Sequence, residues 1–473
     1  MDRRFEERKR QLLAECEVPP AVFGGIQERL VTFAEPFVQC LARGEQREHA
    51  RLYCSGLLSD LPRKNTESIA YRHDQERKNL QNFIGQSAWD YEPLLAELAR
   101  QVGAELGEED GVLVLDPSGF PKKGRHSVGV ERQWCGRLGK VDNCQIGVYL
   151  GYVSSVEHTL IDMRLYLPKS WTTDRARRKQ GHIPRTVRYQ SRTQLALDML
   201  LQRRSLLPHR WVTGDDELGR ASWFRRRLRE LEERYLMAVP STTTVRDLEV
   251  PPPEYSGFGG VPKPRFISVA KWREALAADA WTRLKVRDGT KGPLMVDIVA
   301  CRVQARDEHR CVGDEEVLVV IRRTDDAGQT IHDYYFSNAP RETALAEFAR
   351  AAKAHHRVEE CIQRSKGEAG LADYEVRSYG GWYHHQTLSL IATWFLVQES
   401  RRGKKIHTSD DGSPDRCRPL AVAAQCQPLQ RSRSRRTRPE PPTAAKRTGQ
   451  ALSLEITQQI TSSEHQETTI LEQ

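Results

Sequence analysis

A length of 473 residues predicts two or three domains. No run approaches the ~18 apolar residues of a membrane span, and the charged N-terminus lacks the apolar core of a signal peptide, so we expect a cytoplasmic protein. The ten cysteines form no Cys-x-x-Cys pair, which argues against a zinc ribbon or a redox motif, while the net charge of +9 favours a polyanionic partner.

The first 105 residues are predicted to be helical. Apolar residues recur there at helical spacing, for example Phe33 and Phe37. Residues 51–70 are similar to two short helices interrupted at Pro62, because proline cannot continue a helix. We expect residues 1–105 to form a helical N-terminal domain.

The stretch around Asp116 predicts the first strand of a central sheet. Residues 112–115 are continuously apolar, which is typical of a strand buried on both faces, and we expect this strand to end at Asp116. A carboxylate fixed at the rim of a sheet suits a metal ion. The expected turn that follows carries Lys122 and Lys123, which suit a phosphate. The alternative is a strand followed by a solvated turn.

The next elements predict a mixed sheet with helices on its faces. Two further strands would complete an antiparallel meander, and a fourth strand would end at Asp215. In an RNase H-like sheet the first and fourth strands are neighbours, so Asp215 would lie beside Asp116. The expected elements are strands at 143–153 and 160–167, a basic loop at 175–188, helices at 193–202 and 223–233, and a fifth strand at 235–239.

Residues 240–338 break this order and predict a β-rich insertion. A Pro/Gly-rich link at 251–264 cannot form regular structure. Three runs with strand character follow at 294–303, 316–322 and 333–337, and residues 324–328 are typical of a hairpin loop between the last two.

Helical periodicity returns after residue 341. One predicted helix carries Glu359 and Lys366 on a single face and ends near Gly367 or Gly370. A second helix is expected at 383–397. The segment 399–473 is basic and poor in apolar residues, which predicts a disordered tail that binds nucleic acid loosely through charge.

Three carboxylates, Asp116, Asp215 and Glu359, would converge if the sheet forms as expected. Packed together they repel one another unless cations compensate. A pair of Mg²⁺ ions would supply that compensation, and this chemistry suits cleavage and transfer of phosphodiesters. The neighbouring Asp216 and Glu360 compete for two of these roles, but the spacing favours the first acid of each pair. Each acid has a purely structural role as its alternative.

Several longer motifs resemble DDE transposases of the insertion sequence 701 family. Residues 116–130, 132–136 and 139–145 resemble the first catalytic block, and residues 334–340 and 374–385 resemble later blocks. The resemblance covers roughly residues 20 to 398. It implies an RNase H-like catalytic domain over residues 106–398, interrupted by the insertion.

By this resemblance, the protein cuts and rejoins DNA at the ends of a mobile element and associates with the bacterial nucleoid. Asp116, Asp215 and Glu359 would bind two Mg²⁺ ions, which Mn²⁺ may replace, and Lys366 would contact a DNA phosphate. An ordinary surface ion pair is the alternative for Lys366. The family's arginine before the glutamate is replaced by His355. A homodimer would hold the terminal inverted repeats and the target DNA.

Further residues are expected to contact DNA, with the N-terminal helices binding the terminal repeats. Trp281, like Trp272, would either stack on a flipped base, as in related transposases, or pack in the core. Residues 382, 384 and 385 would either approach DNA or pack at the start of a helix. An RNase H-like nuclease without strand transfer and an inactive DNA-binding derivative remain the rival functions. The predicted DNA-binding residues are Lys122, Lys123, Arg125, Arg178, Lys179, Arg377 and Trp281.

Overall fold

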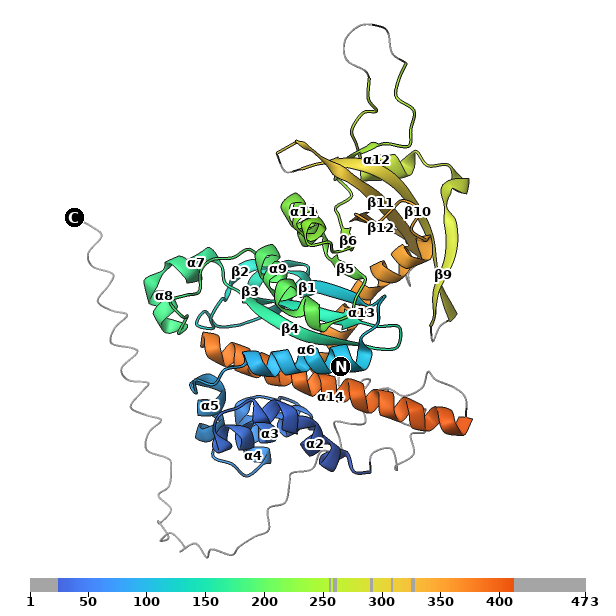
Figure 1. Cartoon of the computed structure of the whole chain (residues 1–473). Coiled ribbons are helices and arrows are strands. Elements are labelled where there is room, and N and C mark those ends of the chain that lie inside the picture. The colour runs from blue at the N-terminus through green and yellow to red at the C-terminus, as the bar shows by residue number, and fades with distance from the viewer. Residues whose placement is uncertain are drawn as a thin grey trace, which may run out of the picture. The chain divides into compact units, whose positions relative to one another are not determined.

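The structure of the chain is a computed structural model (Figure 1). It describes residues 24–254, 257, 262–289, 292–307, 309–324 and 328–411. All of these lie in the first of two compact units, residues 1–428. Parts of the predicted Pro/Gly-rich link and hairpin loop, and the predicted tail from residue 412 onward, lie outside the described residues.

The described part of the N-terminal region, from residue 24 onward, is helical, as predicted. The break at Pro62 is also confirmed, because one helix ends at Leu57 and the next begins at Thr66. Asn65 caps the second of these helices, since its side chain accepts a hydrogen bond from the backbone N–H of Ser68 at 2.8 Å. The helices are α2 (Ile26–Gln39), α3 (Gly44–Leu57), α4 (Thr66–Arg72), α5 (Arg77–Gly85) and α6 (Glu92–Leu106).

A mixed sheet follows, with the strand order β4-β3-β1-β5-β6. Strand β1 is antiparallel to β3 and parallel to β5, β3 is antiparallel to β4, and β5 is parallel to β6. Three antiparallel strands joined to two parallel ones in this order form the predicted RNase H-like sheet. The strands are β1 (Val112–Pro121), β2 (Glu131–Cys135), β3 (Lys140–Val153), β4 (His158–Tyr166), β5 (Trp211–Gly214) and β6 (Tyr235–Ala238).

Two details of this sheet differ from the predictions. Strand β1 does not end at Asp116 but continues to Pro121, because its second half still pairs with β3 after its other neighbour, β5, has ended at Gly214. Asp116 therefore lies in the middle of a strand, at the point where one side of that strand becomes free. Strand β2, which pairs with the start of β3, was missed.

The basic segment 175–188 was predicted to be a loop, but it begins with a short helix. Asp174 caps this helix by accepting hydrogen bonds from the N–H groups of Ala176 and Arg177. The helices of this part are α7 (Lys169–Thr173), α8 (Arg175–Gln180), α9 (Arg192–Arg203), α10 (Asp216–Arg220) and α11 (Ser222–Glu230).

Helices cover both faces of the sheet. Side chains alternate along a strand, so Tyr149 and Gly151 of β3 share one face while Leu150 points to the other. Tyr149 donates a hydrogen bond to Gln386 of α14 (Tyr379–Asp411), and Gly151 lies against Val358 of α13 (Leu345–Glu368). On the opposite face, Asp162, the cross-strand partner of Leu150, pairs with Arg203 of α9. The sheet is therefore a central layer between two helical layers.

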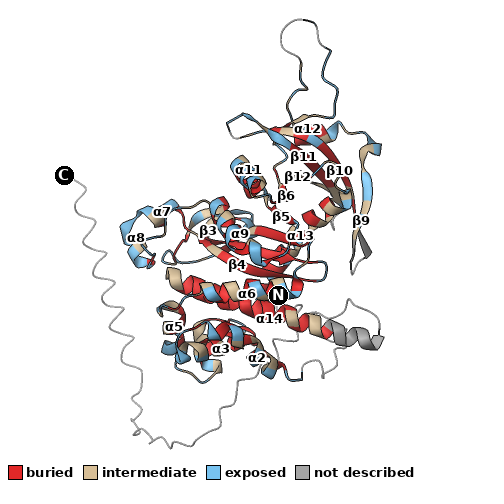
Figure 2. Cartoon of the chain, viewed as in Figure 1, coloured by how far each residue is buried: buried red, intermediate tan, exposed pale blue. Residues whose placement is uncertain are grey.

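Helix α14 is buried on nearly all sides over its first two-thirds (Figure 2). It packs against β4 on one side and against α3 and α5 on another. This explains its apolar character all around the helix. The helix predicted at 383–397 thus begins earlier and continues to Asp411. Neither α14 nor any other helix in the described part of the chain has the length and apolar character needed to cross a membrane.

The first residues of α14 pack against the N-terminal helices. The side chains of Trp382 and His385 are fully buried, and His384 lies between the backbone carbonyls of Ile84 and Trp89 at 2.9 Å each. These side chains pack the junction between α14 and the N-terminal helices. Packing, rather than an approach to DNA, is therefore the correct alternative for them.

The insertion extends the same sheet. Strand β12 pairs with β6, and β11 and β10 follow outward, so an unbroken hydrogen-bonded ladder joins the insertion to the central sheet. The three predicted strands are present, and three short or edge strands were missed. The elements are β7 (Thr244–Asp247), β8 (Ile267–Ser268), α12 (Val269–Glu274), β9 (Thr282–Gly289), β10 (Gly292–Arg306), β11 (Val312–Thr324) and β12 (Thr330–Ser337).

Strand β11 shows how the insertion is held. Val317, Val319 and Ile321 belong to the main hydrophobic core, while Leu318 and Val320 belong to a second core with Trp272 of α12 and residues of β10. The two sets alternate because successive side chains point to opposite faces of a strand. One continuous apolar run therefore serves two cores.

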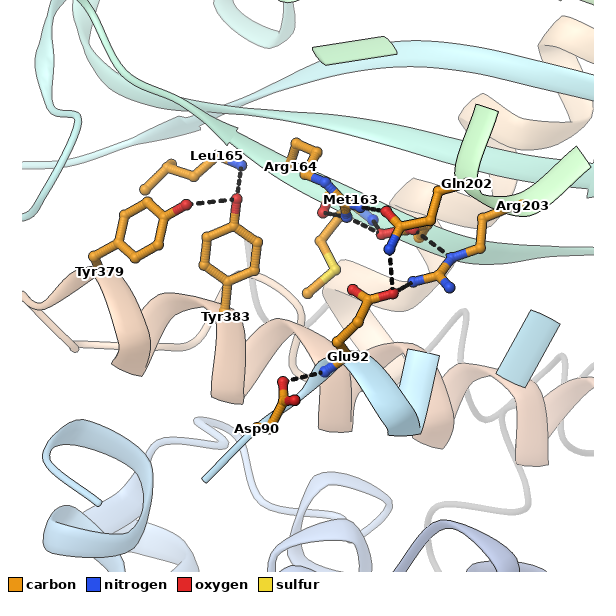
Figure 3. Close-up of polar contacts among 10 residues, drawn as sticks. Asp90, Glu92, Met163, Arg164, Leu165, Gln202, Arg203, Tyr379 and Tyr383 are labelled. Carbon is orange, nitrogen blue, oxygen red and sulfur yellow. Dashed lines mark hydrogen bonds and ion pairs between the residues drawn. The ribbon is translucent and has the colours of Figure 1, made fainter. Parts of the chain in front are cut away.

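A buried ion network ties β4 to the helical layers (Figure 3). Asp162, which is fully buried, accepts a hydrogen bond from Arg203 Nε at 2.7 Å and pairs with Arg164. Arg203 also pairs with Glu92 at the start of α6. One buried and one half-buried carboxylate and two guanidinium groups thus neutralise one another at this junction.

Candidate active site

Two aspartates meet where β5 ends. Leu115 of β1 is paired with Gly214, the last residue of β5, so Asp116 and Asp215 occupy the next positions, in β1 and directly after β5. Asp215 caps α10, because its side chain accepts a hydrogen bond from the N–H of Leu218 at 3.1 Å. Asp216 points to solvent and pairs with Arg220 at 3.0 Å. The predicted neighbourhood of the first and fourth strands is confirmed, and Asp215 is the acid that faces Asp116.

Helix α13 brings Glu359 to the same place. A Cβ atom at Gly151 would lie 2.5 Å from Val358 Cγ2, so only glycine lets α13 approach β3 this closely. Val358 is buried against the sheet, and the following residue, Glu359, lies at the rim with a side chain that is 51% exposed. The negative charge of Glu359 contributes to raising the pKa of Asp116.

The electrostatics of the site are those of crowded acids. Burial raises the pKa of Asp116 to about 7, repulsion from Glu359 adds to the rise, and Lys366 opposes it. Burial also raises the pKa of Asp215 to about 7, with repulsion from Asp116 as the second cause. The pKa of Glu359 is lowered, chiefly by its hydrogen bond with His356. The positive charges near the two aspartates therefore do not offset the effect of burial and repulsion on their pKa values.

Lys366 is buried rather than exposed. Its Nζ donates a hydrogen bond to Ser118 Oγ at 2.8 Å and lies 4.6 Å from the centre of the Phe120 ring, both on the second half of β1. Burial lowers the pKa of Lys366 to about 8. A surface ion pair, the alternative role, is excluded by this position. Ser118 was not singled out from the sequence, which gives no signal for it beyond its place two residues after Asp116.

The chemistry of the three carboxylates fits a divalent cation. Oxygen ligands are those that Mg²⁺ prefers, and a cation would stabilise the ionised forms that burial now disfavours in Asp116 and Asp215. In the part of the chain that the structure describes, no group of three or more His, Cys, Asp or Glu side chains has ligating geometry as it stands. Binding of an ion by these carboxylates would therefore require their side chains to move.

Some of the predicted DNA-binding residues make contacts within the protein, and the others are exposed. Lys122 lies 3.4 Å from the centre of the Tyr374 ring, and burial lowers its pKa to about 8. Arg178 is bonded to three backbone carbonyls of its own segment, at Thr172, Pro184 and Val187. Both therefore hold local structure. The exposed cations among the predicted residues are Lys123, Arg125, Lys179 and Arg377.

Three distant segments meet around these exposed cations. The N–H of Val128 bonds to the carbonyl of Arg377 at 3.0 Å, and the N–H of Tyr379 bonds to the carbonyl of Gly181 at 2.7 Å. A hollow of about 380 Å³ lies between the segments, and Arg377 is part of its lining. The loop after β1, the end of helix α8 and the segment that leads into α14 thus lie side by side.

Trp281 lies elsewhere, in the insertion. It lines a hollow of about 620 Å³ together with several arginines, and the Arg322 guanidinium lies 4.4 Å from the centre of its ring. Arg323 and His332 line the same hollow and were missed, since basic residues in a half-exposed strand give no distinctive pattern. Trp272 is buried and donates a hydrogen bond to Asp247 at 2.7 Å, so it packs the core of the insertion.

Comparison with known proteins defines the class of protein to which this fold and site belong. The family model of the DDE superfamily endonuclease matches residues 36–293, more than half of the chain. The chain belongs to this family. The matched region contains Asp116 and Asp215 and ends before Glu359.

A particular relative is a probable transposase for insertion sequence element IS701 from Microchaete diplosiphon. It is 34% identical over 94 residues, which cover 20% of this chain and 25% of the relative. The match thus spans a quarter of the relative's length. Among solved structures, a synaptic complex of piggyBac transposase with hairpin DNA aligns with 82% of this chain and 71% of that chain, at 9% identity and a TM-score of 0.39. That score does not establish a common fold.

Proposed function

We propose that this protein is a DNA transposase that cleaves and rejoins phosphodiester bonds at the ends of an insertion sequence. The observation that carries the proposal is the meeting of Asp116, Asp215 and Glu359, from two strands and a helix, in a chain of the DDE superfamily endonuclease family. The three acids would bind Mg²⁺ or Mn²⁺. When bound, such ions activate an attacking oxygen and stabilise a leaving one.

The chain itself would supply the positioning. Asp116 and Asp215 are held on paired strands, and Asp215 is fixed further by its bond to Leu218 N–H. Glu359 is carried by a 24-residue helix packed on the sheet, so its distance from the aspartates depends on that packing. Lys366 places a buried positive charge next to this carboxylate group. In successive steps, water and then a DNA 3′-hydroxyl would be the attacking groups.

Double-stranded DNA would bind across the exposed cations. Lys123, Arg125, Lys179 and Arg377 are exposed, and each would contact backbone phosphates without reading bases. The arginine-lined hollow around Trp281 is a second place where DNA would be held. Two element ends must be joined at once, so we propose a homodimer as the active form.

A strand-transfer assay tests the activity. Full-length protein is incubated with end-labelled DNA carrying the terminal repeats, a target plasmid and Mg²⁺ or Mn²⁺. Cleaved and joined products are expected. Cleavage without joining would support a nuclease that only hydrolyses, and binding without either product would support an inactive DNA-binding derivative.

Matched variants test the site residues. Asp116→Asn and Glu359→Gln should each lower cleavage by at least about a thousandfold, because a carboxylate that acts on the transition state is lost, while DNA binding stays. The controls are Asp216→Asn and Glu360→Gln, which change neighbouring exposed acids and should keep most activity. An equal loss of cleavage in Asp116→Asn and Asp216→Asn, or in Glu359→Gln and Glu360→Gln, would contradict the assignment.

A further inference from the structure

His355 stands between two of the proposed metal ligands. Its Nε2 lies 3.6 Å from Asp116 Oδ1, and its Nδ1 lies 3.6 Å from Glu359 Oε1. Its side chain is 20% exposed, and Nε2 is buried without a hydrogen-bond partner. A single imidazole thus faces carboxylates from two different elements, β1 and α13.

The helix explains this placement. His355 precedes Glu359 by four residues, so both lie on one face of α13, one turn apart. Ala354 and Val358, one position before each of them, are buried against the sheet and fix the rotation of the helix. His356, the next residue, points away from Asp116, is more than half exposed and contacts Glu359 and Glu360.

The two contact distances of His355 distinguish a charged imidazolium that bridges carboxylates from an imidazole that ligates a metal ion. A charged imidazolium that bridges carboxylates makes short hydrogen bonds of about 2.7–2.9 Å, and both contacts are too long for that. Neighbouring ligands around an octahedral ion with bonds of about 2.1 Å lie about 3 Å apart. Only one ring nitrogen can ligate a given ion, and the separation of Nε2 from Asp116 exceeds this by about half an ångström, which side-chain rotation can close, while Nδ1 faces Glu359 from the other edge of the ring.

We propose that Nε2 of His355 is a nitrogen ligand of the metal held by Asp116, with Nδ1 turned towards Glu359. The proposal rests on the metal site of the proposed function. An arginine at this position, as the family resemblance implied, cannot ligate a cation because it keeps its proton, whereas an imidazole can. Nitrogen ligation favours Mn²⁺ over Mg²⁺, since Mg²⁺ takes oxygen ligands almost exclusively.

Pulsed electron paramagnetic resonance of Mn²⁺ bound to the untagged full-length protein tests this. A directly ligated imidazole gives ¹⁴N modulation in the spectrum. The modulation should be present in the wild type and in His356→Gln, and absent in His355→Gln. Mn²⁺ binding measured by calorimetry should weaken by at least about tenfold in His355→Gln, with a smaller change for Mg²⁺.

The outcomes separate this proposal from the one it rests on. Mn²⁺ that binds without ¹⁴N modulation in the wild type overturns the role of His355, and this result needs no variant to fold. Modulation that survives in His355→Gln overturns it as well. Mn²⁺ binding that is unchanged in Asp116→Asn overturns the metal site of the proposed function itself.

Discussion

His385 is a histidine that the fold keeps without charge. It is fully buried, its Nδ1 lies 2.9 Å from the Tyr53 hydroxyl and its Nε2 lies 3.0 Å from the carbonyl of Gly370. Burial lowers the pKa of His385 from 6.5 to about 3. The hydroxyl can donate to Nδ1 and Nε2–H to the carbonyl, so the neutral ring satisfies all of these groups.

The free energy of unfolding should therefore depend on pH. Between pH 6.5 and about 3 the unfolded chain takes up a proton at His385 that the folded chain does not. Stability from this group is thus complete above pH 6.5 and is lost as the pH falls, by about 2 kcal/mol at pH 5. Denaturant unfolding at pH 7.5 and pH 5 measures the change. His385→Gln should reduce the difference, and His309→Gln, on the surface, should not; an unchanged difference in both would contradict the prediction.

For single residues, the sequence predicted the acids of the candidate site but not the side chains that contact them. Asp116 and Asp215 stood out because each follows an apolar run, and the pairing of β1 with β5 brings them together. The contacts of His355 with Asp116 and of Lys366 with Ser118 join residues more than 230 positions apart. Such contacts depend on the packing angle of α13, which no local pattern encodes.

At the scale of elements, the approach of α13 to β3 depends on the missing side chain of Gly151. We predict that Gly151→Ala pushes the helix outward through Val358, costs about 1–3 kcal/mol of stability and lowers DNA cleavage. Unfolding and cleavage assays measure the two effects. A second change, Val358→Ala, should restore part of the cleavage in the double variant. Gly85→Ala is the control, because a Cβ there meets nothing within 4 Å.

The ion network around Asp162 gives a second prediction at this scale. Asp162→Asn leaves the guanidinium groups of Arg164 and Arg203 buried beside a neutral amide, which should cost about 3–5 kcal/mol. Denaturant unfolding measures the loss. Glu230→Gln removes the partner of Arg227 in an exposed pair and should cost less than about 1 kcal/mol. Similar losses in both variants would show that burial adds nothing to the network.

Element types were predictable where the apolar pattern was long. The runs in β3, β10 and β11 are continuous or alternating, and all three strands are present. Strand β2 was missed because it alternates half-exposed and exposed residues, with Trp134 56% exposed, and so lacks an apolar face. Strand β1 was predicted too short because Pro117 and Gly119 are typical of turns, yet pairing with β3 keeps them extended.

At the scale of the whole described chain, one backbone ladder joins the central sheet to the insertion. We predict that amides of β11, such as those of Val319 and Val320, exchange with solvent as slowly as those of Leu113 and Val114 in β1. Hydrogen exchange followed by mass spectrometry measures this, with the outer strand β8 as a fast-exchanging reference. Much faster exchange across all of β10–β12 would show that the insertion opens independently.

Strand β6 is the narrowest part of that ladder. Three residue pairs join it to β5 and three join it to β12. Together with the shared hydrophobic core, these few rungs connect the insertion to the central sheet, and β5, the strand next to β6, ends at Gly214, directly before Asp215. A molecule bound to the insertion could therefore act through β6 on the end of β5, so that its binding would be mechanically coupled to the proposed metal ligand Asp215.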